Sequence, residues 1–211
     1  MEQNLIDTIG SAKLVPVIKL NKTEDAIPLV DALVAGGLSV AEITFRTAVA
    51  ADAIAAIRKA RPSVLVGAGT VLTIEQARRA IAAGASFVVS PGFNPAVVDF
   101  CVEKLIPVIP GVASPTEVEM GLARGLNVLK FFPAEAAGGV AMLKALSAVY
   151  EVQFMPTGGI SEKNVASYLA LKNVLACGGS WMVKPELIEQ GKLEQIKQIT
   201  REAVELVKGI V

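Results

Sequence analysis

Lys130 lies in the apolar segment 128–133, Val-Leu-Lys-Phe-Phe-Pro, where a charged side chain is unusual. Apolar surroundings disfavour the ammonium form and leave a neutral amine, which is a nucleophile. A lysine at a strand end can instead extend its ammonium to water, and this interpretation suits Lys19, which lies close to a predicted loop. Three apolar residues follow Lys130 before any turn. We therefore predict that Lys130 is buried and either forms a Schiff base with a carbonyl substrate or holds an anion.

A second apolar segment carries polar residues at every other position: Glu42, Thr44 and Arg46. Alternate residues of a strand project from the same face, so we expect these side chains in one row. A structural Glu–Arg pair is one explanation, because the two charges can satisfy each other. The other is a site in which Glu42 carries protons and Arg46 binds a carboxylate through two hydrogen bonds. Glu135, shortly after Lys130, is the reserve candidate for the proton carrier.

The composition removes several classes of function. The chain has no histidine, which excludes Ser-His-Asp and Cys-His hydrolases and metal sites built on imidazole. We therefore expect neither a metal nor a cofactor. The 20 basic and 20 acidic residues balance, and the densest basic pair is only Arg78-Arg79. This balance predicts no nucleic-acid partner and no polybasic membrane surface.

We also expect a cytoplasmic protein. The longest uncharged stretch, 80–98, has nineteen residues, but its serines, prolines, glycine and asparagine interrupt it, so no membrane span is predicted. The segment 1–13 is acidic and lacks the apolar core of a signal peptide. Cys101 and Cys177 are too few for a disulfide framework, and we expect buried thiols in a reducing compartment.

The elements that hold these residues alternate: short apolar runs are followed by longer helical patterns eight times. The runs recur every 20 to 27 residues, the length of one strand and one helix. This predicts an α/β fold, a (β/α)8 TIM barrel forming a single domain over 1–211. The alternative is an open doubly wound sheet, whose Gly-x-Gly-x-x-Gly turn does not follow the first run. The predicted strands are 14–20, 41–46, 64–70, 87–91, 107–112, 128–133, 153–159 and 174–180.

A barrel places its chemistry at the C-terminal ends of its strands. The last two predicted strands end in Pro-Thr-Gly-Gly (156–159) and Gly-Gly-Ser (178–180). Glycine turns after these strands, leading to a helix N-terminus, are the usual phosphate site of a barrel, although each could be only a tight turn. Thr70, at the end of the third predicted strand, could bind a carboxylate or carbonyl or could simply cap a helix.

Six segments carry a family likeness over nearly the whole chain. They are Ala-Glu-Ile-Thr-Phe-Arg-Thr (41–47), Val-Gly-Ala-Gly-Thr-Val (66–71), Ser-Pro-Gly (90–92), Lys-Phe-Phe-Pro-Ala-Glu (130–135), Pro-Thr-Gly-Gly-Ile (156–160) and Gly-Gly-Ser-Trp (178–181). Together they resemble the bacterial 2-keto-3-deoxy-6-phosphogluconate (KDPG) aldolases, which often also accept 4-hydroxy-2-oxoglutarate (KHG).

The resemblance implies a metal-independent class I aldolase of the Entner–Doudoroff route, usually a homotrimer. Its small-molecule substrate would be a phosphorylated 2-keto acid, cleaved to pyruvate and glyceraldehyde 3-phosphate. By the resemblance, Lys130 is the Schiff-base lysine, Glu42 is the general acid/base, and Arg46 and Thr70 hold the pyruvyl carboxylate. The remaining pocket residues it implies are Pro91, Phe132 and Thr157, with Gly158, Gly159, Gly179 and Ser180 in the phosphate-binding turns.

Other functions fit the same barrel. A non-covalent phosphosugar isomerase or epimerase would use the phosphate turns without a nucleophilic lysine, so Lys130 and Arg46 favour the aldolase. A catalytically silent binding protein would have lost Lys130 or Glu42, and neither is replaced. The 2-keto-3-deoxy-6-phosphogalactonate aldolases differ in stereochemistry at C4, which the sequence leaves open. It also leaves open the preference between KDPG and KHG.

Overall fold

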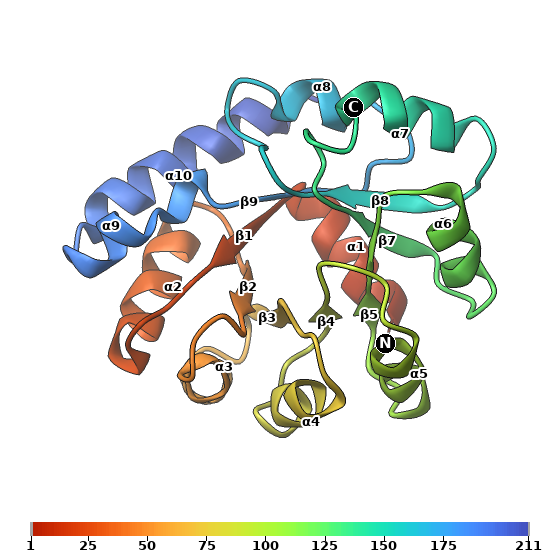
Figure 1. The fold of residues 1–211 in the computed structure, drawn as a ribbon. Coiled ribbons are helices and arrows are strands. Elements are labelled where there is room, and N and C mark those ends of the chain that lie inside the picture. Colours follow the sequence, from red (N-terminus) through yellow and green to blue (C-terminus); the bar gives the residue numbers. More distant parts are fainter. Residues whose placement is uncertain (1, 211) are drawn as a thin grey trace.

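Short parallel strands curl around the centre of the molecule, and helices cover their outer side (Figure 1). The computed structural model describes residues 2–210. The strands in this range are β1 (Leu14–Ile18), β2 (Val40–Thr44), β3 (Leu65–Gly69), β4 (Val88–Val89), β5 (Val108–Ile109), β6 (Gly111–Val112), β7 (Val128–Phe131), β8 (Gln153–Pro156) and β9 (Cys177–Gly179).

The strands form two sheets that adjoin each other. One has six strands in the order β5-β4-β3-β2-β1-β9, and the other has three in the order β6-β7-β8. β5 and β6 are separated only by Pro110, which has no N–H to donate to a sheet. Parallel bridges from Phe154 to Val174 and from Thr157 to Gly178 join β8 to the segment that contains β9. The predicted α/β fold with parallel strands is confirmed, while the fifth predicted strand, 107–112, is divided in two.

The strands end earlier than the apolar runs predicted. The run 41–46 stops as a strand at Thr44, and the run 128–133 stops at Phe131. The run 174–180 keeps only Cys177–Gly179 as a strand. Hydropathy does not distinguish a buried strand from the buried turn that follows it, because both exclude charged residues. Arg46 and Phe132 therefore lie in turns beyond the strands to which the sequence assigned them.

The helices follow the strands as the repeat predicted, with two additions: α1 before the first strand, and a second helix after β9. Helix α1, which the sequence pattern did not predict, buries Leu5 and Ile9 in a small cluster with inward-facing strand residues such as Val15 and Met155. The helices are α1 (Glu2–Ala12), α2 (Ala26–Ala35), α3 (Ala50–Ala60), α4 (Ile74–Ala82), α5 (Pro95–Glu103), α6 (Pro115–Leu122), α7 (Gly139–Ser147), α8 (Val165–Leu169), α9 (Pro185–Glu189) and α10 (Leu193–Lys208), with short 3-10 helices η1 (Thr23–Asp25) and η2 (Trp181–Val183).

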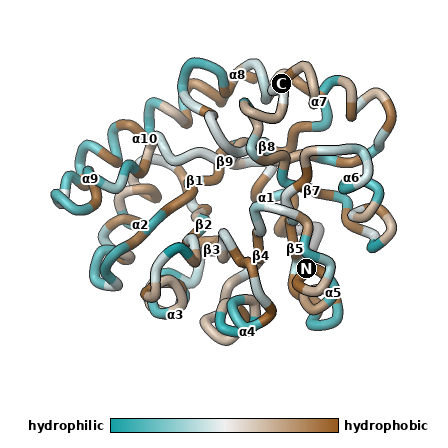
Figure 2. The backbone as a smooth tube through the Cα atoms, viewed as in Figure 1, coloured by the Kyte–Doolittle hydropathy of each residue, from teal (hydrophilic) through white to brown (hydrophobic). Residues whose placement is uncertain are grey.

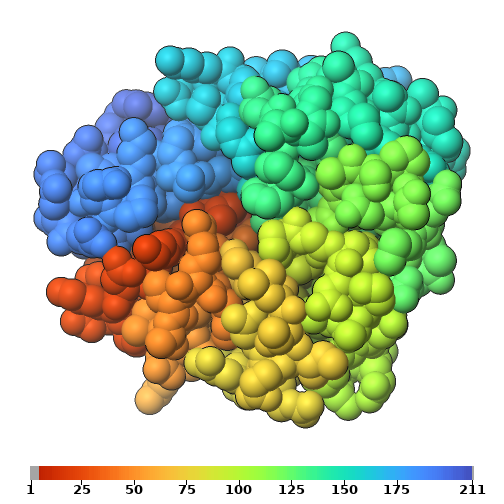
Figure 3. All heavy atoms as spheres, viewed as in Figure 1, coloured from red at the N-terminus to blue at the C-terminus, as the bar shows by residue number. Residues whose placement is uncertain are grey.

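A larger apolar cluster fills the space between the strands and the helices. The outer helices α9 and α10 are largely hydrophilic along their solvent side (Figure 2). Red and blue segments lie side by side (Figure 3), in agreement with the pairing of β1 with β9. None of the described helices is both long enough and apolar enough to cross a bilayer.

Helix α5 ends in a motif that normally calls for glycine. The N–H of Leu105 donates to the carbonyl of Val102, and the N–H of Ile106 donates to that of Cys101. These two bonds define a Schellman motif, whose left-handed residue is here Leu105, with a φ of 55°. Leu105 is also 91% exposed, so its side chain gains little from packing. A non-glycine residue in this conformation costs about 1–2 kcal/mol.

We expect Leu105→Gly to raise the free energy of unfolding by about 0.5–1 kcal/mol, because relief of the left-handed strain exceeds the entropy that glycine loses on folding. Urea denaturation of the two proteins measures the difference. Lys13→Gly is the contrasting variant: Lys13 is also left-handed, but its ammonium donates to the carbonyl of Ile210, and this bond would be lost. A neutral or destabilising Leu105→Gly would contradict the explanation.

Candidate active site

Lys130 on β7 and Glu42 on β2 form a buried ion pair across the interior of the curled strands. The distance from Lys130 Nζ to Glu42 Oε1 is 3.6 Å, and the side chains are 5% and 0% exposed. Neither carboxylate oxygen of Glu42 has a hydrogen-bond partner among the described residues. A buried carboxylate without hydrogen bonds is costly, so a bound water or ligand at this point would be stabilised. The predicted burial of Lys130 is confirmed.

Gly69 on β3 makes room for Glu42. A Cβ added at Gly69 would overlap Glu42 Oε1 and would lie 2.6 Å from the carboxyl carbon. The carboxylate therefore lies directly over the backbone of the neighbouring strand. Any side chain at this position would push Glu42 away from Lys130.

Arg46 lies in the turn after β2 and is exposed, not inside the strand as predicted. It remains tied to the row that the sequence indicated: Arg46 Nε donates to Thr44 Oγ1 over 3.3 Å. Thr44 is fully buried and donates in turn to the carbonyl of Ile18 at 2.8 Å. The structural Glu–Arg explanation is wrong, because Glu42 is paired with Lys130 and accepts no hydrogen bond from Arg46.

A cavity of about 300 Å³ opens above Lys130, at the C-terminal ends of the strands. It brings together all the predicted site residues except Glu42, which lies against Lys130 and does not line the cavity. The predicted residues that line it are Arg46, Thr70, Pro91, Lys130, Phe132, Thr157, Gly158, Gly159, Gly179 and Ser180.

The cavity also has two lining residues that sequence reasoning missed, Val17 and Ile160, together with Gly178, the first residue of the predicted turn 178–180. Val17 is an ordinary apolar residue of β1, so no polar signal marked it. Ile160 directly follows the predicted turn 156–159 and could have been found by extending that turn by one residue.

Two residues beside the cavity have distinctive geometry. Thr70 has a left-handed φ of 54°, which is strained for a β-branched residue and recurs at functional sites. It does not cap helix α4, whose cap is Thr73, accepting from the N–H of Gln76. The ring of Phe132 lies with its centroid 5.3 Å from Lys130 Nζ, within cation–π range.

The first glycine turn adopts a conformation that only glycine takes without strain. Gly158 and Gly159 have φ values of 101° and 80°. The next helix after this turn is α8, which begins at Val165. In the segment between the turn and α8, Asn164 Nδ2 donates to the carbonyl of Gly159, at 3.0 Å. The second turn, in contrast, runs through Ser180 straight into η2.

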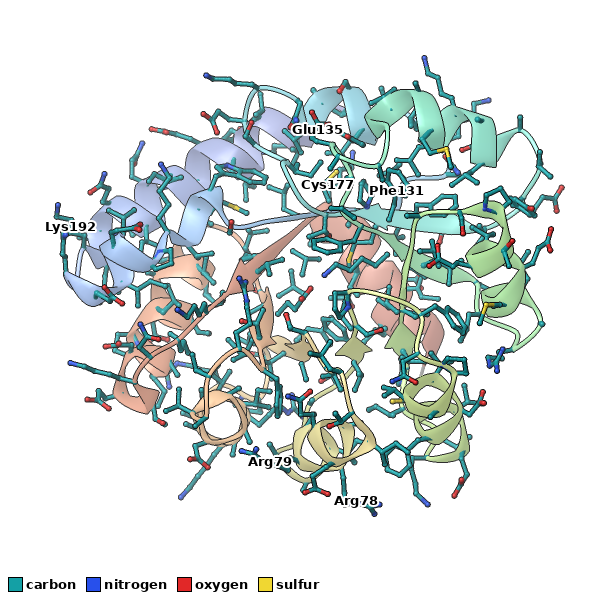
Figure 4. The ribbon with its side chains drawn as sticks, viewed as in Figure 1. Arg78, Arg79, Phe131, Glu135, Cys177 and Lys192 are labelled. Carbon is teal, nitrogen blue, oxygen red and sulfur yellow. The ribbon has the colours of Figure 1, made fainter. Side chains whose placement is uncertain are left out.

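Glu135 is directed away from the pair of Lys130 and Glu42. Its carboxylate accepts a hydrogen bond from the hydroxyl of Tyr168 on α8, and Glu135 is not among the residues that line the cavity. Figure 4 shows it beside α8. The carboxylate next to Lys130 is therefore that of Glu42.

The remaining candidates lie outside the site or are inert. Cys101 and Cys177 are free and buried, as predicted, and burial raises the pKa values of their thiols to about 11 and about 12, so both stay protonated at neutral pH. Arg78 and Arg79 lie on the outer helix α4 (Figure 4). Lys19 is partly exposed beyond the end of β1, in agreement with its predicted contact with water.

Comparison with known proteins gives one consistent result. Residues 5–199 match the model of the family described as KDPG and KHG aldolase. A 2-dehydro-3-deoxy-phosphogluconate aldolase of Treponema pallidum is 52% identical over 204 residues, covering 96% of this chain and 97% of the relative.

Two solved structures have the same fold. The KDPG aldolase of Legionella pneumophila, with pyruvate captured as a covalent carbinolamine intermediate, has a TM-score of 0.91 at 44% identity and covers 93% of this chain and 96% of its own. The 2-keto-3-deoxy-6-phosphogluconate aldolase of Zymomonas mobilis ZM4 with 3-phosphoglycerate has a TM-score of 0.89 at 40% identity, with 98% of each chain covered.

Proposed function

The chain belongs to the KDPG and KHG aldolase family, and on that premise we propose that it cleaves KDPG to pyruvate and glyceraldehyde 3-phosphate through a Schiff base on Lys130. One observation carries the assignment of residues: the amine of Lys130 lies 3.6 Å from the carboxylate of Glu42, buried beneath a cavity of about 300 Å³. A non-covalent isomerase or epimerase would have no use for this lysine.

The reaction begins when Lys130 passes a proton to Glu42 and its neutral Nζ attacks the C2 ketone. The carbinolamine takes that proton back as it loses water to give an iminium. Glu42, through a water molecule, removes the proton of the C4 hydroxyl. The C3–C4 bonding electrons then move into the iminium, which releases glyceraldehyde 3-phosphate and leaves the enamine of pyruvate. Protonation at C3 and hydrolysis free pyruvate and restore the amine. The covalent intermediate replaces one difficult carbanion-forming step with easier ones.

The position of Glu42 suits each charged stage of this reaction. Its carboxylate faces the ammonium of Lys130 in the free protein, and the iminium formed at the same nitrogen is also a cation. A fixed negative charge in a water-poor site stabilises such a cation without reorganisation. Neither oxygen of Glu42 has a hydrogen-bond partner among the described residues, so a water that reached the carboxylate from the cavity would find both acceptors unused.

The two ends of the substrate would lie on opposite sides of Lys130. We assign the pyruvyl carboxylate to Arg46 and Thr70, which lie after β2 and β3. We assign the phosphate to the turns formed by Gly158, Gly159 and 178–180, whose backbone N–H groups suit an anion. Pro91, Phe132 and Thr157 complete the wall of the cavity.

Four further properties belong to the proposal. The order of the two sheets, the division at Pro110 and the bridges from β8 to the β9 segment support a closed (β/α)8 barrel forming a single domain. Turnover of KHG and assembly as a homotrimer follow from the family resemblance. A cytoplasmic location is consistent with the free thiols of Cys101 and Cys177.

Lys130→Met should abolish the covalent intermediate. Incubation with pyruvate and borohydride is expected to add one reduced pyruvyl group to the wild-type chain, located on Lys130 by peptide mapping, and none to the variant, because the thioether is not an amine. Intact-mass measurement reads both results. An adduct on another lysine, such as Lys19, would transfer the role, and an unmodified wild type would exclude Schiff-base chemistry.

Glu42→Gln should slow KDPG cleavage by about 10²–10⁴-fold, the usual contribution of a positioned acid/base. Gln keeps the shape of Glu42 but cannot take a proton, so pyruvate should still bind and still be trapped on Lys130. Turnover and trapping measured on the same preparation separate the two steps. Full activity in this variant would move the role to Glu135.

Thr44→Val should raise the KM for KDPG about tenfold with a smaller change in kcat, because Arg46 would lose the hydroxyl that orients its guanidinium. Thr47→Val is the matched control: the hydroxyl of Thr47 donates to the carbonyl of Leu20 at 2.6 Å, a similar bond to the same segment, whereas the guanidinium of Arg46 donates to Thr44. Thr44→Ser should restore the KM. Equal effects of the two valine variants would reduce Thr44 to a structural role.

A further inference from the structure

We propose that Tyr168 and Glu135 form a positioning pair that fixes the turn Gly158-Gly159, and that this pair sets the preference of the enzyme for a phosphorylated aldehyde. The inference rests on the proposed function, in which this turn binds the substrate phosphate. It assigns Glu135 a role other than proton transfer.

The turn is tied to neighbouring segments by three successive carbonyl groups. The N–H of Ala134 donates to the carbonyl of Thr157 at 2.8 Å, and the N–H of Glu135 donates to that of Gly158 at 3.1 Å. Asn164 Nδ2 donates to the carbonyl of Gly159 at 3.0 Å. Two of these three bonds come from the loop that follows β7, the strand of Lys130. The turn is thus held by the segment that also holds the nucleophile.

The side chain of Glu135 packs on the same turn. A Cβ added at Gly159 would lie 2.5 Å from Glu135 Cγ and 2.8 Å from Glu135 Cβ, so the stem of Glu135 lies against the backbone of Gly159. Two features require glycine at position 159: this close contact and the positive φ. Movement of Glu135 would therefore free the turn on its outer side.

Tyr168 determines where Glu135 lies. Its side chain is fully buried on α8, and its hydroxyl donates to Glu135 Oε1. Burial, together with the hydrogen bond to Glu135, raises the pKa of Tyr168, so the hydroxyl keeps its proton and remains a donor. The exposed carboxylate of Glu135 is thereby held in one orientation.

The turn needs such support because two consecutive glycines have little conformational preference of their own. Among the described residues, the N–H groups of Gly159 and Ile160 donate no hydrogen bond to the protein. Donors that are fixed before the anion arrives bind it without paying for reorganisation. The Tyr168–Glu135 pair supplies this fixation from outside the cavity, where it does not contact the substrate.

The test is condensation of pyruvate with D-glyceraldehyde 3-phosphate or with D-glyceraldehyde, expressed as the ratio of the two kcat/KM values. In Tyr168→Phe the ratio should fall about tenfold, since displacement of a binding group by ~1 Å can cost that much or more. The loss should fall on the phosphorylated aldehyde, with trapping of pyruvate on Lys130 unchanged. Glu135→Gln keeps an acceptor for the hydroxyl and should keep the ratio within about threefold.

The chain offers a matched control. Its other tyrosine, Tyr150, donates to Glu119 Oε1 at 2.9 Å, in the loop before β8 and so at the opposite end of the strands. Tyr150→Phe should leave the ratio unchanged. An unchanged ratio in Tyr168→Phe, with a normal wild type, would overturn the positioning role alone. A wild type that neither traps pyruvate nor condenses it would instead defeat the proposed function. Loss of all turnover in Glu135→Gln, with the fold retained, would return proton transfer to Glu135.

Discussion

A single buried charge pair explains much of the arrangement of this protein. Burial of Lys130 and Glu42 without a full set of hydrogen bonds costs several kcal/mol, and such a pair persists only where the surrounding structure leaves it no alternative. β2 and β7 supply that constraint, because buried parallel strands hold the two side chains facing each other. Gly69 contributes because it has no side chain, so the carboxylate of Glu42 can lie against the backbone of β3.

The other residues of the site lie around this pair, in the turns that follow the strands. Thr70, Arg46, Phe132 and Ser180 lie in turns just after strands, so the sheet holds the N-terminal side of each turn. In the proposed mechanism, the strand interior therefore holds the reacting groups and the turns recognise the two ends of the substrate. It is the usual division in folds whose chemistry lies at the C-terminal ends of parallel strands.

Some features follow from local pattern alone. The alternation of Glu42, Thr44 and Arg46 predicted a common face, and a lysine within Val-Leu-Lys-Phe-Phe-Pro predicted burial. The caps also follow from local chemistry: at the starts of α5 and α6, Asn94 accepts from the N–H of Ala96 and Ser114 from that of Glu117. These features depend on residues a few positions apart, whose relative geometry is fixed by the backbone period.

The sequence by itself therefore predicted an α/β fold with parallel strands, the burial of Lys130 and nearly every residue that lines the cavity. Tertiary structure alone decided the partners. Glu42 pairs with Lys130, 88 positions away in the chain, and not with its strand neighbour Arg46, while Glu135 turns to Tyr168. The tertiary structure also decided where the strands stop, and it buried Leu5 and Ile9 of α1. The reason is physical: a buried polar group is satisfied by whatever the folded chain brings within reach, and that proximity has no signature in local hydropathy or spacing.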